Sequence, residues 1–109
     1  MPLFAINSKY TPETLAAARK EGLAHREAAA KAIIEQLGGK LLAFYWLSSP
    51  DWDYVGIGEF ASADDPYALV SMAMASGAFQ RSQVTPLRTS AEADAAIARQ
   101  LNWTPPGQS

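Results

Sequence analysis

Residues 44–59, FYWLSSPDWDYVGIGE, hold most of the side chains whose types and spacing could do chemistry. Aromatic residues and carboxylates crowd here around a Ser-Ser-Pro turn. One interpretation is a ligand pocket, because Gly56 and Gly58 share the strand parity of Tyr54 and leave room where side chains would otherwise stand. The candidate ligand-binding residues of this pocket are Tyr45, Trp52, Asp53 and Tyr54.

A second interpretation of the same stretch is structural. Residues 48–51 are turn formers, and the carboxylate of Asp53 can accept hydrogen bonds from backbone amides across the turn. The aromatic side chains would then belong to the core and to a subunit interface. The sequence leaves both interpretations open, and neither identifies a substrate.

Arg26 is a charged residue within the apolar stripe of an expected helix. The stripe is formed with Ala30, Ile33 and Leu37. A partly buried guanidinium needs a partner, because an isolated charge in a low-dielectric site is very costly. We expect that partner to be Glu59, with Asp53 as the alternative acceptor. The pair would fix the helix to the sheet, or would hold a carboxylate ready to receive a proton from a substrate, so Arg26 and Glu59 join the candidate site.

The other reactive residue types form no recognisable site. His25, the single histidine, is turned about 100° from Arg26 around the helix and is expected in solvent. The chain has no cysteine, which excludes disulfides, thiolate nucleophiles and Cys-ligated metals. The serines lack a G-x-S-x-G motif, and no glycine-rich phosphate loop precedes a helix. We therefore expect neither a metal nor a cofactor.

Length and charge limit the class of protein. A chain of 109 residues fits one domain with a single core. The net charge is −2 and no basic run is present, so nucleic acid is not an expected partner. No apolar run approaches the ~20 residues that span a bilayer, and the N-terminus lacks the features of a signal peptide. We expect a cytoplasmic protein that does not enter membranes.

Apolar runs and turn residues predict four strands, over residues 2–7, 40–47, 53–60 and 82–88. A long helix is expected from Pro12 to about Leu37, with Thr11 as its N-cap and Gly38 as its stop, and with a kink or interruption at Gly22. A second helix is expected between Asp64 and Gly77.

A third helix begins at residues 89–92, which match a capping box. Its apolar stripe is Ala93, Ile97 and Leu101. The element order is therefore β-α-β-β-α-β followed by a terminal helix, an α+β fold of the ferredoxin-like arrangement. In that topology the fourth strand lies at a sheet edge, in agreement with Pro86, which cannot donate a ladder hydrogen bond. We predict one domain over residues 1–101 and a C-terminal tail over 102–109.

Both faces of the predicted sheet are apolar. In strand 40–47, Leu41, Ala43, Tyr45 and Leu47 fall on one parity, and Leu42, Phe44 and Trp46 on the other. The two helices of a ferredoxin-like fold cover the same face, so a monomer would expose an apolar patch on the other. This pattern predicts a homodimer that packs sheet against sheet.

Several segments resemble the GYD domain family, small bacterial proteins named for a Gly-Tyr-Asp signature. These segments are residues 10–13, the helix end at 26–39, residues 44–46, Trp52-Asp53, and Glu59 followed by Asp64-Asp65. The likeness covers residues 3 to about 89. In the signature Asp53 is kept, Trp52 stands where tyrosine is usual, and Pro50-Asp51 occupies the glycine region. The resemblance implies a dimeric α+β barrel but no agreed reaction.

Two functional hypotheses of different classes follow. The first is a homodimeric domain that binds a small ligand or a protein partner without catalysis. The second is a cofactor-free enzyme, monooxygenase- or isomerase-like, acting on a small aromatic or polar substrate. This second hypothesis rests on analogy with other dimeric α+β barrels. The lack of a well-placed histidine or cysteine favours the first.

Overall fold

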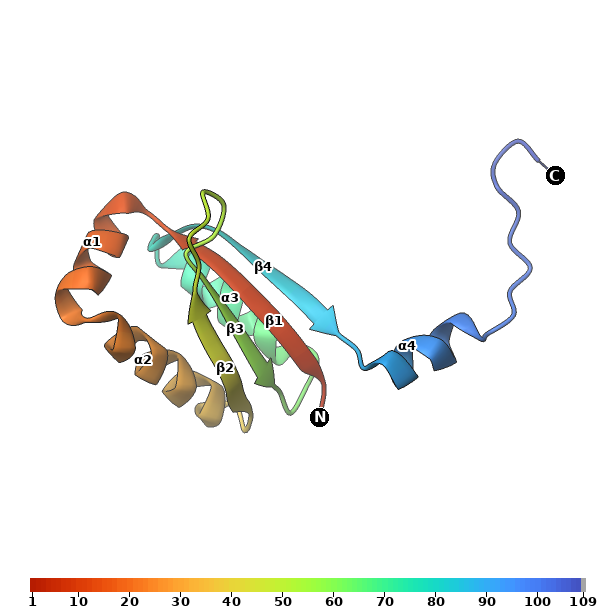
Figure 1. The fold of residues 1–109 in the computed structure, drawn as a ribbon, viewed down its shortest axis with the longest axis horizontal. Helices are drawn as coiled ribbons and strands as arrows, with labels where there is room; N and C mark the ends of the chain where they lie inside the picture. Colours follow the sequence, from red (N-terminus) through yellow and green to blue (C-terminus); the bar gives the residue numbers. More distant parts are fainter. Residues whose placement is uncertain (109) are drawn as a thin grey trace.

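The computed structural model describes residues 1–108 and has the predicted order of elements. The strands are β1 (Leu3–Tyr10), β2 (Lys40–Trp46), β3 (Tyr54–Glu59) and β4 (Phe79–Leu87). The helices are α1 (Pro12–Glu21), α2 (Leu23–Gln36), α3 (Asp65–Ala75) and α4 (Ser90–Ile97). The strands form one antiparallel sheet in the order β2-β3-β1-β4 (Figure 1). The α+β, ferredoxin-like class with one additional helix is confirmed.

The predicted edge strand is confirmed, and two strand boundaries differ from the prediction. β4 lies at a sheet edge, as Pro86 indicated. However, β1 extends three residues beyond the expected 2–7 and β4 begins at Phe79 rather than at residue 82. The two strands pair from Leu3↔Leu87 to Tyr10↔Phe79. The polar residues at these strand ends gave no local signal for a strand. The ends are stabilised by hydrogen-bonded pairing between distant segments and not by a local apolar pattern.

The helix boundaries follow the predicted signals. Gly22 adopts φ 105°, which a residue with a side chain rarely adopts, and it divides the expected long helix into α1 and α2. The hydroxyl of Thr11 accepts a hydrogen bond from the Thr14 amide at 3.3 Å and caps α1. Thr89 and Glu92 form the predicted capping box of α4. That helix ends at Ile97, so Leu101 lies beyond it.

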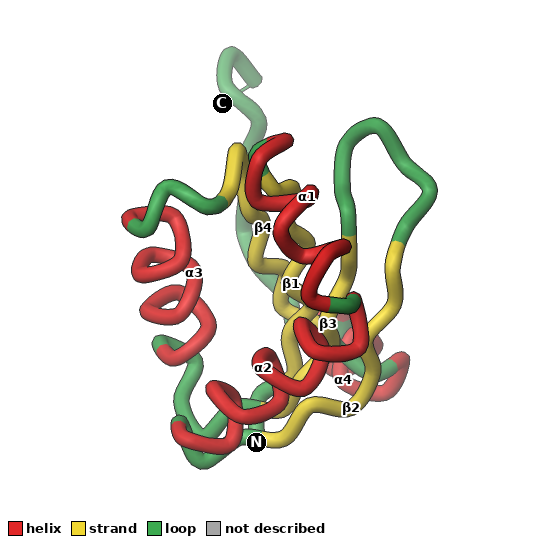
Figure 2. Tube along the Cα trace, turned by 90° about the vertical axis from the view of Figure 1, so that its left-hand side faces the viewer, coloured by secondary structure: helices red, strands yellow, loops and turns green. Residues whose placement is uncertain are grey.

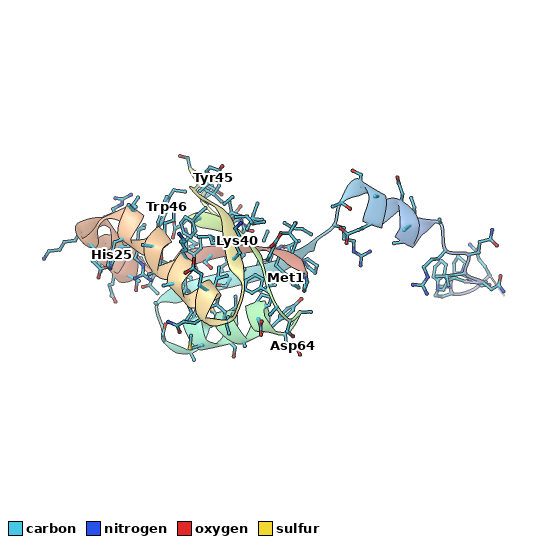
Figure 3. All side chains as sticks on the ribbon, turned by 90° about the horizontal axis from the view of Figure 1, so that it is seen from below. Met1, His25, Lys40, Tyr45, Trp46 and Asp64 are labelled. Carbon is cyan, nitrogen blue, oxygen red and sulfur yellow. The ribbon has the colours of Figure 1, made fainter. Side chains whose placement is uncertain are left out.

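Helices α2 and α3 lie on one side of the sheet (Figure 2). On this covered face Phe4 and Ile6 of β1 pack with Ile34 of α2 and with Phe60 to form the buried core. No helix within residues 1–108 covers the opposite face, which we call the open face. Its apolar residues, by strand register, are Leu3, Ala5, Ala43, Tyr45, Val55 and Ile57. Figure 3 shows Tyr45 pointing away from the side that carries α3.

A β-bulge changes the facing of β2. The register passes from Leu41↔Gly58 directly to Ala43↔Ile57, so Leu42 is the additional residue. The parity predicted for this strand is therefore wrong at its start: Leu41 lies on the covered face with Phe44 and Trp46. A bulge inserts one residue against its partner strand, and every side chain before it changes face.

Among residues 1–108, no helix has both the length and the apolarity that a membrane crossing requires.

Candidate functional site

A cleft lies between α2, α3 and the covered face of the sheet, with a volume of about 250 Å³. Ala30 and Ile33 line it from α2, Leu69 and Ala73 from α3, and Tyr54 from the sheet. A smaller cavity of about 50 Å³ adjoins it and reaches Gly56 and Gly58. A Cβ at Gly56 would make an ordinary contact with Phe44 at 3.5 Å, whereas a Cβ at Gly58 would lie 3.2 Å from the backbone carbonyl of Lys40. Gly56 therefore leaves room for a small side chain, and Gly58 does not. We call the pair of cavities the α2–α3 cleft.

The floor of the α2–α3 cleft is aromatic. Tyr54 stacks on Phe44 with ring centroids 4.8 Å apart, and Tyr10 stacks on Phe79 at 4.7 Å. Tyr10 and Tyr54 meet at 5.7 Å and join the two stacks. Trp46 packs edge-on against Tyr54 at 5.6 Å. The rings contact one another in stacked, tilted and edge-on arrangements, so this floor is a packed, mainly apolar surface.

Few polar groups reach the cleft. The hydroxyls of Ser8 and Ser82 hydrogen-bond to each other at 2.9 Å across β1 and β4. Arg26 is the one charged residue in the described lining. Its Nη1 lies 3.9 Å from Oε2 of Glu21, with 36% of the Arg26 side chain exposed. A long ion pair at the surface contributes little to stability. The guanidinium can therefore leave Glu21 and bind an anion with little loss of free energy.

Tyr54 is a neutral phenol in this setting. Burial raises the pKa of Tyr54 to about 12, and the nearby Ser8 hydroxyl opposes that shift only in part. Desolvation disfavours the phenolate because a charge loses its hydration in an apolar site. At neutral pH the Tyr54 hydroxyl therefore keeps its proton and can donate it in a hydrogen bond, but it cannot serve as a ready base.

Asp53 closes the corner between β2 and β3. Its carboxylate accepts a hydrogen bond from the backbone amide of Tyr10, with Oδ2 2.8 Å from the nitrogen. Its own amide donates to the carbonyl of Ser8 at 2.9 Å, and its carbonyl accepts from the amide of Leu47 at 2.8 Å. These contacts attach the corner to β1. The geometry favours the structural interpretation of Asp53.

The loop around Trp52 is held from β4. The guanidinium of Arg81 lies over the Trp52 ring, 5.0 Å from its centroid. Nη2 of Arg81 also donates to the backbone carbonyl of Asp51 at 2.9 Å and lies 3.1 Å from the Asp51 carboxylate. Trp52 is thus fixed in a loop contact and lies outside the lining of the α2–α3 cleft.

The predicted ion pair between Arg26 and Glu59 is wrong. Tyr54, Gly56 and Gly58 face the helices. Glu59 alternates with them along the strand, so its side chain belongs to the open face, and it lies at the opposite end of β3 from Tyr54. Arg26 lies beside Tyr54 on the covered side. Within the described chain its ion pair is with Glu21, and Asp53 is not its acceptor.

Tyr45 also lies on the open face and is 64% exposed. Of the six candidate residues, the structure brings Arg26 and Tyr54 together in the cleft.

The family model of the GYD domain matches residues 4–97. The chain belongs to the GYD domain family. The match begins at the second residue of β1, includes the other three strands of this GYD domain and reaches the last residue of α4. It extends further toward the C-terminus than the segments that resembled the family. No curated protein is significantly similar to the chain.

Sequence reasoning missed most of the residues that line the cleft of this GYD domain. Four of them are Ser8, Tyr10, Phe79 and Ser82. A signal for two of them was present, because Phe4, Ile6, Ser8 and Tyr10 share one parity. Extending the first strand past residue 7 would have placed Ser8 and Tyr10 on the covered face.

His25 is exposed on α2, as predicted (Figure 3). Within residues 1–108, no group of three or more His, Asp or Glu residues lies close enough to hold a metal ion.

Proposed function

We propose that this GYD domain is a homodimer that binds a small ligand in the α2–α3 cleft without catalysing a reaction. The observation that carries the proposal is the cleft itself: about 250 Å³ of open space above an aromatic floor, with few polar groups at its edge. Concave, mainly apolar sites with a small number of placed polar groups are the usual form of small-ligand sites.

The lining supports one chemical class of ligand. The stacked rings of Tyr54 and Phe44 offer flat faces, which match a planar, apolar body. Arg26 supplies a positive charge at the same cleft, and a guanidinium binds a carboxylate through two parallel hydrogen bonds. We therefore infer a small aromatic monoanion, such as an aryl carboxylate, with its ring over the floor and its charge toward Arg26.

The same lining favours binding over the enzyme alternative. The described lining residues include no histidine and no carboxylate that could move a proton. Tyr54 remains protonated at neutral pH, because burial raises its pKa to about 12. The guanidinium of Arg26 offers N–H donors only and no acceptor. These groups can orient a ligand, whereas general acid–base chemistry needs a group that titrates near the working pH.

The open face supports the homodimer. Tyr45 and Leu42 on β2 are 64% and 46% exposed, and Val55 and Ile57 are half-buried on the same sheet. A second copy of the chain, packed on this face, would cover these side chains. Sedimentation equilibrium should return about twice the chain mass of 11.7 kDa; a monomer that does not change on dilution would refute the dimer.

The ligand proposal is tested by titrating the protein with benzoate and with the neutral analogue benzamide, while backbone NMR signals are followed. Ala30 lines both cavities from α2, so Ala30→Phe should fill the cleft. The exposed Ala32 lies on the same helix outside the lining, and Ala32→Phe is the matched control with the same change in helix propensity.

Benzoate should shift the amide signals of Ile6, Phe44 and Tyr54 more strongly than benzamide does. That response should disappear in Ala30→Phe and persist in Ala32→Phe. Equal responses of the two variants would place binding outside the cleft. If no aromatic or aliphatic fragment shifts these signals, the cleft is not a ligand site.

A further inference from the structure

Residues 90–108 form a C-terminal arm that extends from the end of β4 away from the rest of the molecule (Figures 1 and 3). α4 makes no extensive packing contact with any other described helix or strand. The large apolar side chains of the arm are therefore open to solvent: Ile97, Leu101 and Trp103 are 80%, 79% and 74% exposed.

The dimensions of the chain agree with an arm that lacks its partner. The radius of gyration is 17.2 Å, whereas a compact domain of this length is expected near ~13 Å. The accessible surface is 7434 Å², whereas a folded monomer of this mass is expected to have about 5,900 Å². The surplus of about 1,500 Å² exceeds the roughly 800 Å² that one partner buries in a standard interface.

The sequence of the arm specifies a helix, which argues against an unstructured tail. Thr89 and Glu92 form a complete capping box, with the two reciprocal hydrogen bonds at 3.1 Å. Yet α4 has only eight residues, and isolated helices shorter than about 12–15 residues are marginal in water. A capped but short helix needs an apolar surface to pack on.

We infer that the C-terminal arm packs on a second copy of this chain, against the β2 side of that copy's open face, so that the two copies exchange arms. The inference rests on the proposed homodimer. Within one chain, the arm leaves β4 at one edge of the sheet, and the exposed Leu42 and Tyr45 lie on β2 at the other edge. A two-fold axis that runs along the strands places β4 of one copy over β2 of the other, and brings each arm to those side chains.

Cysteine cross-linking tests the exchange, because the chain has no cysteine of its own. One full-length chain carries Ala93→Cys, at an exposed position of α4; the other carries Ala43→Cys, on the open face of β2. The two chains carry different tags, are mixed to exchange subunits, and are treated with a short bismaleimide. Ala16→Cys, at an exposed position of α1, replaces Ala43→Cys in the control.

We expect a cross-link between the two different chains for the arm and β2 pair, and none for the control. A third chain carries both Ala93→Cys and Ala43→Cys. A link within this chain, together with no link between the mixed single-cysteine chains, would overturn the inference, because the arm would then fold onto its own sheet. No link in a protein that sediments as a dimer would also overturn it and would leave the homodimer standing. A monomer in sedimentation would refute both.

A second variant measures the contribution of the arm to dimerisation. Leu101→Ser should raise the dimer dissociation constant by about tenfold, because it removes one large apolar contact of the arm. Asn102→Ser, at the neighbouring exposed position, should leave the constant unchanged. Equal dissociation constants for the two variants would show that the arm takes no part in the interface.

Discussion

The carboxylate of Asp53 should stabilise the fold, and its two substitutions should separate its roles. Oδ2 of Asp53 accepts from the Tyr10 amide at 2.8 Å, and Tyr10 is 4% exposed. Asp53→Ala leaves this amide without an acceptor in a place that water reaches poorly. An unsatisfied buried donor costs about 1–3 kcal/mol, and an ionised acceptor places the expected loss in the upper part of that range.

Asp53→Asn keeps an oxygen at the same position, so the hydrogen bond can persist without its charge. We expect this variant to lose less than about 1 kcal/mol, because a neutral hydrogen bond has a net value of about that size. A domain of this length loses roughly 4–8 °C in melting temperature per kcal/mol. The alanine variant should therefore melt about 10 °C or more below the parent, and the asparagine variant within a few degrees of it.

Thermal and urea unfolding followed by circular dichroism will measure both losses. Asp51→Ala is the matched control two residues away, since the Asp51 side chain is 67% exposed and pairs at the surface with Arg81; its loss should stay below about 1 kcal/mol. If Asp53→Ala melts like the parent, the loop between β2 and β3 does not depend on this hydrogen bond, and the structural role of the carboxylate is refuted. If Asp53→Asn keeps its stability but loses ligand binding, the carboxylate contacts the ligand.

Three further predictions follow from the same cleft and sheet. Tyr54 should ionise near pH 12 by ultraviolet absorbance, whereas an unfolded tyrosine ionises at about pH 10. This difference contributes up to roughly 3 kcal/mol to the unfolding free energy, which should be present in full below about pH 10 and lost as the pH rises to about 12. Tyr54→Phe should remove this dependence. Gly56→Ala should fold normally, because its new Cβ would lie 3.5 Å from Phe44, while reducing benzoate affinity; a large stability loss would contradict this geometry. Gly39→Ala should lose about 1–3 kcal/mol of unfolding free energy, measured with urea, because its Cβ would clash with the backbone carbonyl of Glu59. A stability equal to that of the parent would show that the start of β2 can move away from the end of β3 at no cost.

The parts of the fold that local residues specify were predictable. Gly22 marked the interruption between α1 and α2, and Thr89 marked the start of α4, because positive φ and helix capping each depend on one or a few neighbouring residues. Pro86 marked an edge strand because a missing amide hydrogen is a local property.

The parts that depend on pairing between distant segments were not predictable. The bulge at Leu42 exists only relative to β3, and no property of the β2 sequence announces it. The ion-pair partner of Arg26 was predicted wrongly because successive residues of a strand face opposite sides of the sheet, and Glu59 lies on the side away from the helices. The hydrogen bond between Ser8 and Ser82 joins residues 74 positions apart, so only the β1–β4 register reveals it.

The most direct test of ligand binding in the α2–α3 cleft is a crystal structure of the protein soaked with benzoate. We expect electron density for the ring above Tyr54 and Phe44, with the carboxylate on the side of Arg26. Density for benzoate only at other surfaces, or a cleft filled by the protein's own side chains, would contradict it.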